Sequence, residues 1–309
     1  MDNRDASTGI SIIIPLYNKQ ATIARAIRSI LAQESVAREA VVVDDGSTDG
    51  SAAVVQSFGS DVVFVKQRNA GPSAARNRGV AASRYPWVMF LDADDELMPG
   101  ALRDHVRCRE RHPDVEATFG SFRVLQGDAV EREELIHGRL PEDASDGGCR
   151  RVDRFLSRLV PAQQSCCVDR TLYDTIGGYD ERLTCWERSD FHMRVLLNAK
   201  AVAVSDRMHL IKHQDVPENS QFERAGRNRS NLVIFAHKIL DEMPRIPEEE
   251  RSFLYGQVKQ GIQQAWKARA LPEFKRLASR ACPILPPEHR PIRLCLAARL
   301  PVRTLKFFR

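Results

Sequence analysis

The stretch WVMFLDADDEL, residues 87–97, joins a run of apolar residues to a dense group of acids. The apolar run predicts a buried strand, because a strand covered on both faces is hydrophobic throughout. It is followed at once by Asp92, Asp94 and Asp95. Carboxylates this close together repel one another. We therefore expect a positive group among them.

Short apolar runs of this kind alternate with segments of helical periodicity along the N-terminal third of the chain. The runs predict strands at residues 10–14, 40–43, 62–65 and 87–91, the first of them stopped by Pro15. Helices are expected at residues 21–33 and 51–58 and from Ser73 onward, with Ser73 as N-cap. This alternation is typical of an α/β fold with a mainly parallel sheet flanked by helices.

Three polar loops follow strands of this predicted sheet. They are PLYN after the first strand, DDGSTD after the second and DADDE after the fourth. Ligands bind outside the carboxyl ends of the strands in such sheets. We therefore expect these loops to meet at one edge and to form the binding site.

The remainder of the chain is less regular. It predicts a helix at 101–111, a strand at 117–125, a loop at 126–150, a strand at SCCV, a helix at 189–198, and strands at 201–205 and 208–212. Helical segments separated by prolines follow, so residues 226–309 are expected to form a helical C-terminal appendage.

Composition and charge limit the function classes. The chain has 309 residues and a formal net charge of +5, with five arginines, one lysine and no acid from Arg290 onward. This basic end fits an ordinary solvated surface, a docking helix or a dimer contact, or peripheral contact with a membrane, and we expect no nucleic-acid partner. No N-terminal signal or membrane-spanning stretch is recognisable. Seven cysteines without a C-x-x-C pair predict free thiols in a reducing cytoplasm.

The acidic loops allow two explanations each. An Asp-x-Asp turn after a strand offers hard oxygen ligands to a divalent ion, or it simply caps the helix that begins near Pro99. Asp45 in VVVDDGSTDGS can accept a hydrogen bond from a pyrimidine base that stacks on Tyr17, or the loop is an ordinary strand-to-helix turn.

Taken together, four motifs favour the functional explanation. SIIIPLYN, VVVDDGSTDGS, NAGPSAARNRGVAAS and VMFLDADDEL, in this order, closely resemble the nucleotide-binding half of family 2 glycosyltransferases, which have the GT-A fold. The resemblance is strong over residues 9–105 and looser to about residue 221, through IGGYDERL, WERSDFHMRVLL and HQDVPENS. It implies a GT-A domain at 1–225, with a nucleotide-binding half at 1–105 and an acceptor-side half at 106–225.

The resemblance implies a role for each matching residue. Pro15 and Tyr17 would line the base pocket, Asp45 would bind the base, and Arg76 would lie near the diphosphate.

For the metal, Asp94 would be the direct ligand of Mg²⁺ or Mn²⁺, and Asp92 would face the ribose and the metal. Asp95 would support the loop. His213 matches a position that approaches the diphosphate or the metal, with a purely structural role equally open.

The acceptor side departs from the family pattern. The family has Glu-Asp at the start of a helix, and that aspartate is the base; this chain has Glu187-Arg188, with Asp190 in frame. A guanidinium stays protonated and cannot accept the proton. Either Glu187 or Asp190 is the base, or the chain binds a sugar nucleotide without efficient transfer. Trp186 is a candidate sugar platform or a core residue.

The function implied is that of a metal-dependent inverting glycosyltransferase. It would move a sugar from a nucleotide diphosphate sugar, with a UDP-sugar as the expected donor, to a glycan or lipid-linked acceptor in surface polysaccharide synthesis. It would work in the cytoplasm, in peripheral contact with the inner face of the cell membrane. One alternative is a catalytically degenerate member that acts as a partner subunit. A nucleotidylyltransferase is disfavoured because PLYNKQAT lacks a glycine-rich phosphate loop.

Overall fold

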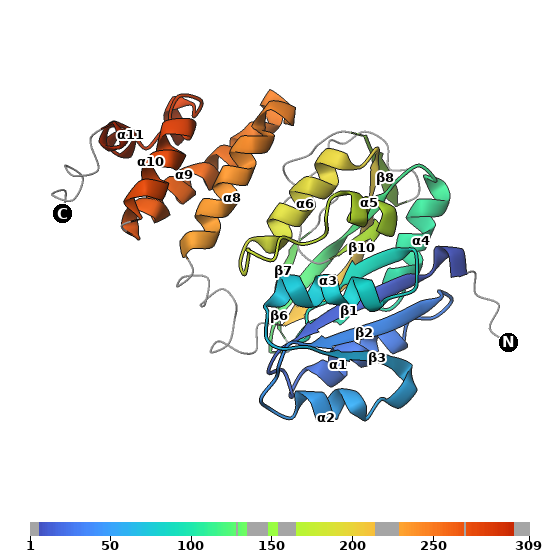
Figure 1. Cartoon of the computed structure of the whole chain (residues 1–309). Coiled ribbons are helices and arrows are strands. Elements are labelled where there is room, and N and C mark those ends of the chain that lie inside the picture. Colours follow the sequence, from blue (N-terminus) through green and yellow to red (C-terminus); the bar gives the residue numbers. More distant parts are fainter. Residues whose placement is uncertain are drawn as a thin grey trace.

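The protein is built around one ten-stranded sheet with helices on both faces (Figure 1). The computed structural model describes residues 6–127, 129–134, 148–153, 165–213, 229–268 and 270–299. The predicted α/β fold class is confirmed, and the reasons lie in the pattern of each strand.

The N-terminal strands form the parallel part of the sheet. They are β1 (Ile10–Leu16), β2 (Arg38–Asp44), β3 (Val62–Lys66) and β4 (Trp87–Phe90), in the order β3-β2-β1-β4. Each pair runs parallel. All of their carboxyl ends therefore lie at one edge, as the apolar runs predicted.

The second half of the sheet mixes directions. β9 (Cys166–Asp169) runs antiparallel between β4 and β6 (Ala117–Gln126), and β10 (Val202–His213) runs parallel to β6. Shorter antiparallel strands complete it: β5 (Glu96–Leu97), β7 (Ala129–Glu134) and β8 (Cys149–Val152). The long strands are thus mostly parallel, and antiparallel strands extend them.

The helices cover both faces, so alternate residues of each central strand enter different cores. α1 (Ile23–Leu31), α2 (Ser51–Gln56) and α4 (Ala101–Arg111) pack with Ile12 and its neighbours on one face. α3 (Pro72–Ala82), α5 (Arg170–Thr175) and α6 (Glu187–Asn198) pack with Ile13 on the other. Burial on both faces explains why β1 is apolar at successive positions.

The C-terminal helices form a bundle beside this domain (orange to red in Figure 1). They are α8 (Arg229–Glu242), α9 (Arg251–Lys267), α10 (Leu271–Ala281) and α11 (Ile292–Ala298). Phe235 and Phe274 are buried in the same core cluster as Ile13 and Phe191, so the bundle shares a continuous apolar interior with the sheet domain. No helix in the described ranges is long and apolar enough to cross a bilayer.

The structure corrects two expected element boundaries near the site. β1 continues through Pro15. The Ile13 carbonyl accepts from the Leu91 amide, so the backbone of Ile13 faces β4. Pro15, two residues later, faces the same neighbour. Because β4 ends at Phe90, the N–H that Pro15 lacks would have had no partner in the sheet. α3 begins at Pro72 after Gly71, and the Ser73 hydroxyl donates to the Leu183 carbonyl at 2.7 Å instead of capping the helix.

Two further corrections concern the second half of the sheet. The expected loop at 126–150 contains strand β7, which pairs with β6 along the sheet edge. Residues 129–133 are exposed, and all but Ala129 and Val130 are charged, so the strand carries no apolar pattern. The two strands expected at 201–205 and 208–212 are one strand, β10, with a register shift between Val204 and Met208.

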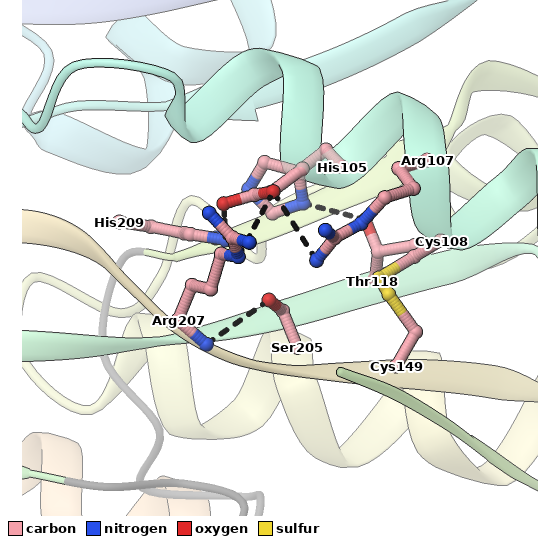
Figure 2. Close-up of a disulfide and its surroundings, with 9 residues drawn as sticks. His105, Arg107, Cys108, Thr118, Cys149, Ser205, Arg207 and His209 are labelled. Carbon is pink, nitrogen blue, oxygen red and sulfur yellow. Dashed lines mark hydrogen bonds and ion pairs between the residues drawn. A yellow bond between two sulfur atoms is a disulfide. The ribbon is translucent and has the colours of Figure 1, made fainter. Parts of the chain in front are cut away.

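The prediction that all the cysteines are free thiols was wrong. Cys108 on α4 is bonded to Cys149 on β8 (Figure 2), and Cys282 at the end of α10 is bonded to Cys295 on α11. Partners that lie 41 and 13 positions apart leave no local spacing signal. Cysteine usage therefore gives no support to the expected reducing cytoplasm. Three cysteines remain free and buried: Cys166, Cys167 and Cys185.

Candidate active site

The loops after β1 and β2 interlock at the carboxyl edge of the sheet. The Asp45 amide donates to the Leu16 carbonyl at 2.8 Å, and the Asn18 amide donates to Ser47 Oγ at 3.0 Å. These bonds bring PLYN and DDGSTD together, as the parallel sheet predicted. Pro15 and Tyr17 are half-buried and flank Leu16, whose carbonyl accepts from Asp45.

Asp45 has a buried carboxylate that organises the loop before α3. Its Oδ1 accepts from Gln67 Nε2 and from the Ala70 amide, both at 2.8 Å, and its Oδ2 accepts from the Gly71 amide at 2.9 Å. Gly71 has φ of +92°, a conformation in which a side chain would be strained. A base that donated a hydrogen bond to Asp45 would meet a carboxylate that this loop already holds in place.

The acidic cluster follows β4. Asp92, Asp94 and Asp95 present carboxylate oxygens that all lie within 4.8 Å of one another. Lys19 Nζ reaches Asp94 Oδ2 at 2.6 Å, and Arg25 donates to the Asp94 backbone carbonyl at 2.6 Å. The positive charge expected among these carboxylates is therefore supplied, in part, by α1 and the loop before it.

Asp92 lies between two guanidinium groups. Arg76 Nη2 donates to its Oδ1 at 3.0 Å, and Arg188 Nη1 donates to its Oδ2 at 2.6 Å. Burial alone would raise the pKa of Asp92, but the charges of Arg188 and Arg76 hold that pKa well below its usual range. Asp92 is therefore ionised at neutral pH.

Asp95 has the opposite electrostatic environment. It is only 2% exposed, and its ionic partner Lys212 is 3.7 Å away. Burial, together with the neighbouring charges of Asp92 and Asp94, raises the pKa of Asp95 to about 7. The three aspartates thus carry less negative charge than three solvated carboxylates would.

Arg76 connects the acidic cluster to the start of α6. Its guanidinium is fully buried, lies 5.1 Å from the ring centroid of Tyr179, and donates from Nη1 to Glu187 Oε1 at 3.2 Å. Burial alone would lower the pKa of Arg76, but the negative charges of Asp92 and Glu187 raise it. A permanent cation therefore fixes both carboxylates in one geometry.

Glu187 and Asp190 have different surroundings at the start of α6. Glu187 is 3% exposed, and its Oε2 makes no hydrogen bond or ion pair with the described residues. Asp190 is fully buried, accepts from Arg194 Nε and Nη2 at 2.9 and 2.7 Å, and pairs with Lys238 Nζ at 2.7 Å. Asp190 is thus neutralised by cations on either side, whereas Glu187 keeps an oxygen available.

Two other candidate residues lie against the rest of the fold. Trp186 stacks on Phe235 of α8, with ring centroids 5.9 Å apart and an interplanar angle of 14°, so one face of its ring is covered. His213 lies beside the cluster: its amide is 3.3 Å from Asp95 Oδ1, but its Nε2 is 2.8 Å from Glu96. The imidazole thus contacts Glu96 and is not part of the carboxylate group.

Sequence reasoning missed several residues around this site. Lys19, Arg25 and Lys212 were not predicted, although Lys19 directly follows PLYN and Lys212 directly precedes His213. Arg188 was noted only as the loss of a base, and its pairing with Asp92 spans 96 positions. A lysine or arginine next to a motif can be recognised from the sequence as a candidate site residue. A partner 96 positions away leaves no such signal in the sequence.

Known proteins match the chain in both sequence and fold. Residues 11–145 match the family described as Glycosyl transferase family 2. Over 265 residues the chain is 46% identical to the succinoglycan biosynthesis protein ExoU of Rhizobium meliloti, covering 81% of this chain and 71% of ExoU. The chain belongs to glycosyltransferase family 2.

This family 2 glycosyltransferase has further relatives. It is 38% identical over 147 residues to the Campylobacter jejuni GalNAc(5)-diNAcBac-PP-undecaprenol beta-1,3-glucosyltransferase, covering 46% of this chain and 44% of that one. Its fold matches S. aureus TarS 1-349 in complex with UDP-GlcNAc, with a TM-score of 0.66 and 18% identity over 96% of this chain and 90% of that one. The chain is thus a glycosyltransferase enzyme with the GT-A fold.

Proposed function

We propose that this enzyme transfers a sugar, with inversion, from a UDP-sugar to a hydroxyl group of a glycan or lipid-linked acceptor in surface polysaccharide synthesis. The observation that carries the proposal is the ion-pair chain from Asp92 through Arg76 to Glu187, which joins the acidic cluster to the acceptor-side helix. A donor bound at the acidic cluster and an acceptor bound at the start of α6 would therefore lie close to each other.

The donor would occupy the carboxyl edge of the sheet. Tyr17 and Pro15, both half-buried, would stack on the base, and the Asp45 carboxylate would accept a hydrogen bond from its N–H edge. The bound UDP-GlcNAc of the structurally similar S. aureus TarS supports this donor class.

A divalent ion, Mg²⁺ or Mn²⁺, would be held by Asp94 and Asp92. The donor set fits: carboxylate oxygens are the ligands such ions prefer, and those of the cluster lie within 4.8 Å of one another. When bound, the ion would offset the charge on the leaving diphosphate. His213 would support the loop through Asp95 and Glu96 and is a weaker candidate ligand.

The residues of the chain would share the remaining work. Glu187 would take the proton from the acceptor hydroxyl through Oε2, while Arg76 fixes its Oε1. Burial alone would lower the pKa of Arg188, but the negative charges of Asp92 and Glu187 raise it. Arg188 would therefore provide fixed positive charge beside the diphosphate. The inverted product would follow from attack on the face opposite the diphosphate, without a covalent intermediate.

The acceptor and the site of action are inferred from relatives and from charge. The similar C. jejuni enzyme is named for an undecaprenol-linked substrate. On α11, Ile292 is 63% and Leu296 57% exposed, beside the exposed Arg293. We infer that this helix brings the enzyme to the anionic surface at the inner face of the cell membrane. Residues 300–309, which complete the basic end, lie outside the described residues.

A donor screen tests the proposed function. Purified enzyme is incubated with a panel of nucleotide sugars and Mn²⁺, and the released nucleotide is measured with and without candidate acceptors. Release from one UDP-sugar, abolished by chelation of the metal, is expected. Tight UDP binding without turnover of any donor would instead support the partner-subunit alternative.

Sedimentation with vesicles of phosphatidylglycerol but not of phosphatidylcholine is the result expected for membrane contact.

A further inference from the structure

The start of α6 follows a backbone conformation that needs support. Trp186, directly before Glu187, has φ of +65° and ψ of +5°. For a residue with a large side chain this left-handed conformation is unfavourable and persists only where the surroundings enforce it. The same turn determines the direction in which Glu187 and Arg188 leave the backbone. The contacts that enforce it therefore bear on the position of both side chains.

Helix α8 of the C-terminal bundle makes these contacts. Asn231 is 4% exposed, and its Oδ1 accepts from the Thr184 amide at 2.5 Å, the Cys185 amide at 2.8 Å and Thr184 Oγ1 at 3.1 Å. One side-chain oxygen thus satisfies consecutive backbone amides immediately before Trp186. Among the described residues that contact this turn, Asn231 is the one that bonds two successive N–H groups.

The next turns of α8 continue the same contact. Phe235, four residues after Asn231, stacks on the Trp186 ring. Lys238, three residues further, pairs with Asp190 and with Asp180, both at 2.7 Å. Positions spaced by four and three residues lie on one face of a helix. The whole of this face is therefore directed at the turn and at the first residues of α6.

The opposite side of the turn is held by the donor half of the domain. Ser73 of α3 donates to the Leu183 carbonyl, and Asn77 Nδ2 donates to the Tyr179 carbonyl at 3.0 Å. The segment that leads to Glu187 is thus fixed between α3, which also carries Arg76, and α8. Without α8 only one of these sides would remain.

We propose that Asn231 is a positioning residue for the transfer reaction, and that α8 holds residues 184–186 in the conformation that places Glu187 against Arg76. The C-terminal bundle is then part of the catalytic apparatus. The proposal rests on the proposed function of Glu187 for its effect on turnover, but the structural part stands independently of it.

Variants of Asn231 separate positioning from general packing. Asn231→Leu keeps the size and removes the acceptor, whereas Asn231→Asp keeps an acceptor oxygen in the same place. Asp241→Ala is the matched control on α8, because Asp241 is exposed and pairs with Arg280 of α10. Turnover, donor KM, the Kd of UDP, and amide hydrogen exchange of residues 184–187 are measured for each.

The expected pattern is specific. Asn231→Leu lowers kcat by about 10- to 100-fold, since small misplacements of a reacting group have effects of this size. The Kd of UDP and the donor KM stay close to wild type, and the Thr184 and Cys185 amides exchange faster. Asn231→Asp restores most of kcat and of the protection, and Asp241→Ala behaves as wild type.

Several results would overturn the proposal. They are unchanged amide exchange in Asn231→Leu, wild-type kcat despite faster exchange, or a loss that Asn231→Asp does not reverse. If Asn231→Leu does not fold, Phe235→Leu takes its place, with lower kcat at unchanged UDP affinity expected and unchanged kcat contradicting. If wild-type enzyme turns over no donor, the proposed function fails, and the exchange data still decide whether Asn231 holds the turn.

Discussion

Arg188 Nη1 donates to Asp92 Oδ2 across 2.6 Å, which joins the start of α6 to the segment after β4 that carries the acidic cluster. The family pattern has an aspartate where this chain has Arg188. The substitution therefore does more than remove a base: it adds a cation to the carboxylate group that would bind the metal. The charge balance of the site depends on it.

The first prediction concerns metal affinity. Arg188→Asp replaces a positive charge near Asp92 with a negative one, so we expect Mn²⁺ to bind at least about tenfold more tightly. The concentration of free Mn²⁺, followed by electron paramagnetic resonance, gives the Kd. Arg182→Asp is the control, because it makes the same change of charge at an exposed residue of the same segment. Equal affinity in the wild-type enzyme and Arg188→Asp would contradict the assigned role.

The second prediction tests Asp94 as the metal ligand. Asp94→Asn removes the charge that pairs with Lys19 and leaves a neutral amide. We expect metal-dependent turnover to fall by about 100-fold or more, because the bound ion would lose a negatively charged ligand. Mn²⁺ should also no longer raise the affinity for UDP in a calorimetric titration. Asp61→Asn, at an exposed position, controls for the loss of an acid. A persistent Mn²⁺ effect in Asp94→Asn would remove Asp94 from the ligand set.

The third prediction concerns the base. Glu187→Gln keeps the oxygen that accepts from Arg76 and removes the proton acceptor. Turnover should fall by roughly 100- to 10,000-fold. The Kd of UDP and the unfolding temperature should stay near their wild-type values. Full activity in this variant would move the role of the base elsewhere.

The fourth prediction separates Asp190 from Glu187 by its effect on stability. Asp190 is fully buried between Arg194 and Lys238, so Asp190→Asn leaves Arg194 without its counter-charge and leaves Lys238 with Asp180 alone. Removing one partner of a buried ion pair costs about 3 to 5 kcal/mol, and we expect a loss of that order in the free energy of unfolding by urea. The stability of Glu187→Gln is the comparison. An Asp190→Asn enzyme as stable as wild type but inactive would make Asp190 the base.

The sequence predicted the N-terminal half of the fold because each element there carries its own signal. The apolar runs of β1, β2 and β4 are buried on both faces, β3 at the sheet edge is partly exposed, and the loops that follow these strands are polar. Strand β7 carries no such signal, since it lies exposed at the sheet edge. The disulfides join cysteines from separate elements, so their pairing depends on the tertiary structure.

The candidate site shows the same division. Asp92, Asp94 and Arg76 belong to motifs with fixed spacing, and the structure brings them together with Glu187. Which cation neutralises which acid depends on contacts between distant segments. The pairing of Arg188 with Asp92 and the hydrogen bonds of Asn231 are of this kind, and no local pattern indicates them.

The last prediction concerns two buried histidines between α4, which carries His105, and β10, which carries His209. His105 and His209 are both fully buried, with ring centroids 4.3 Å apart (Figure 2). Burial, with the charges of Arg107 and Arg207, lowers the pKa of His209 to about 3, and burial together with His209 lowers the pKa of His105 well below its usual range. Asp104 lies 3.8 Å from His209 Nε2, but Arg107 and Arg207 also contact it. Both rings are therefore neutral in the folded protein.

This pair should make the enzyme sensitive to acid. Below about pH 6.5 the unfolded chain takes up protons on both histidines and the folded chain does not, so stability is present above that pH and is lost as the pH falls. Each histidine contributes up to about 1.4 kcal/mol per pH unit to the slope, a limit approached well below about pH 6.5, where the unfolded histidine is fully protonated. The free energy of unfolding by urea, measured between pH 7 and pH 5, should therefore fall less steeply in the double variant His105→Gln/His209→Gln, and each single variant should remove about half of the difference. The slope is compared, because the substitutions themselves alter packing at every pH. A double variant with the wild-type slope would show that other groups control acid sensitivity.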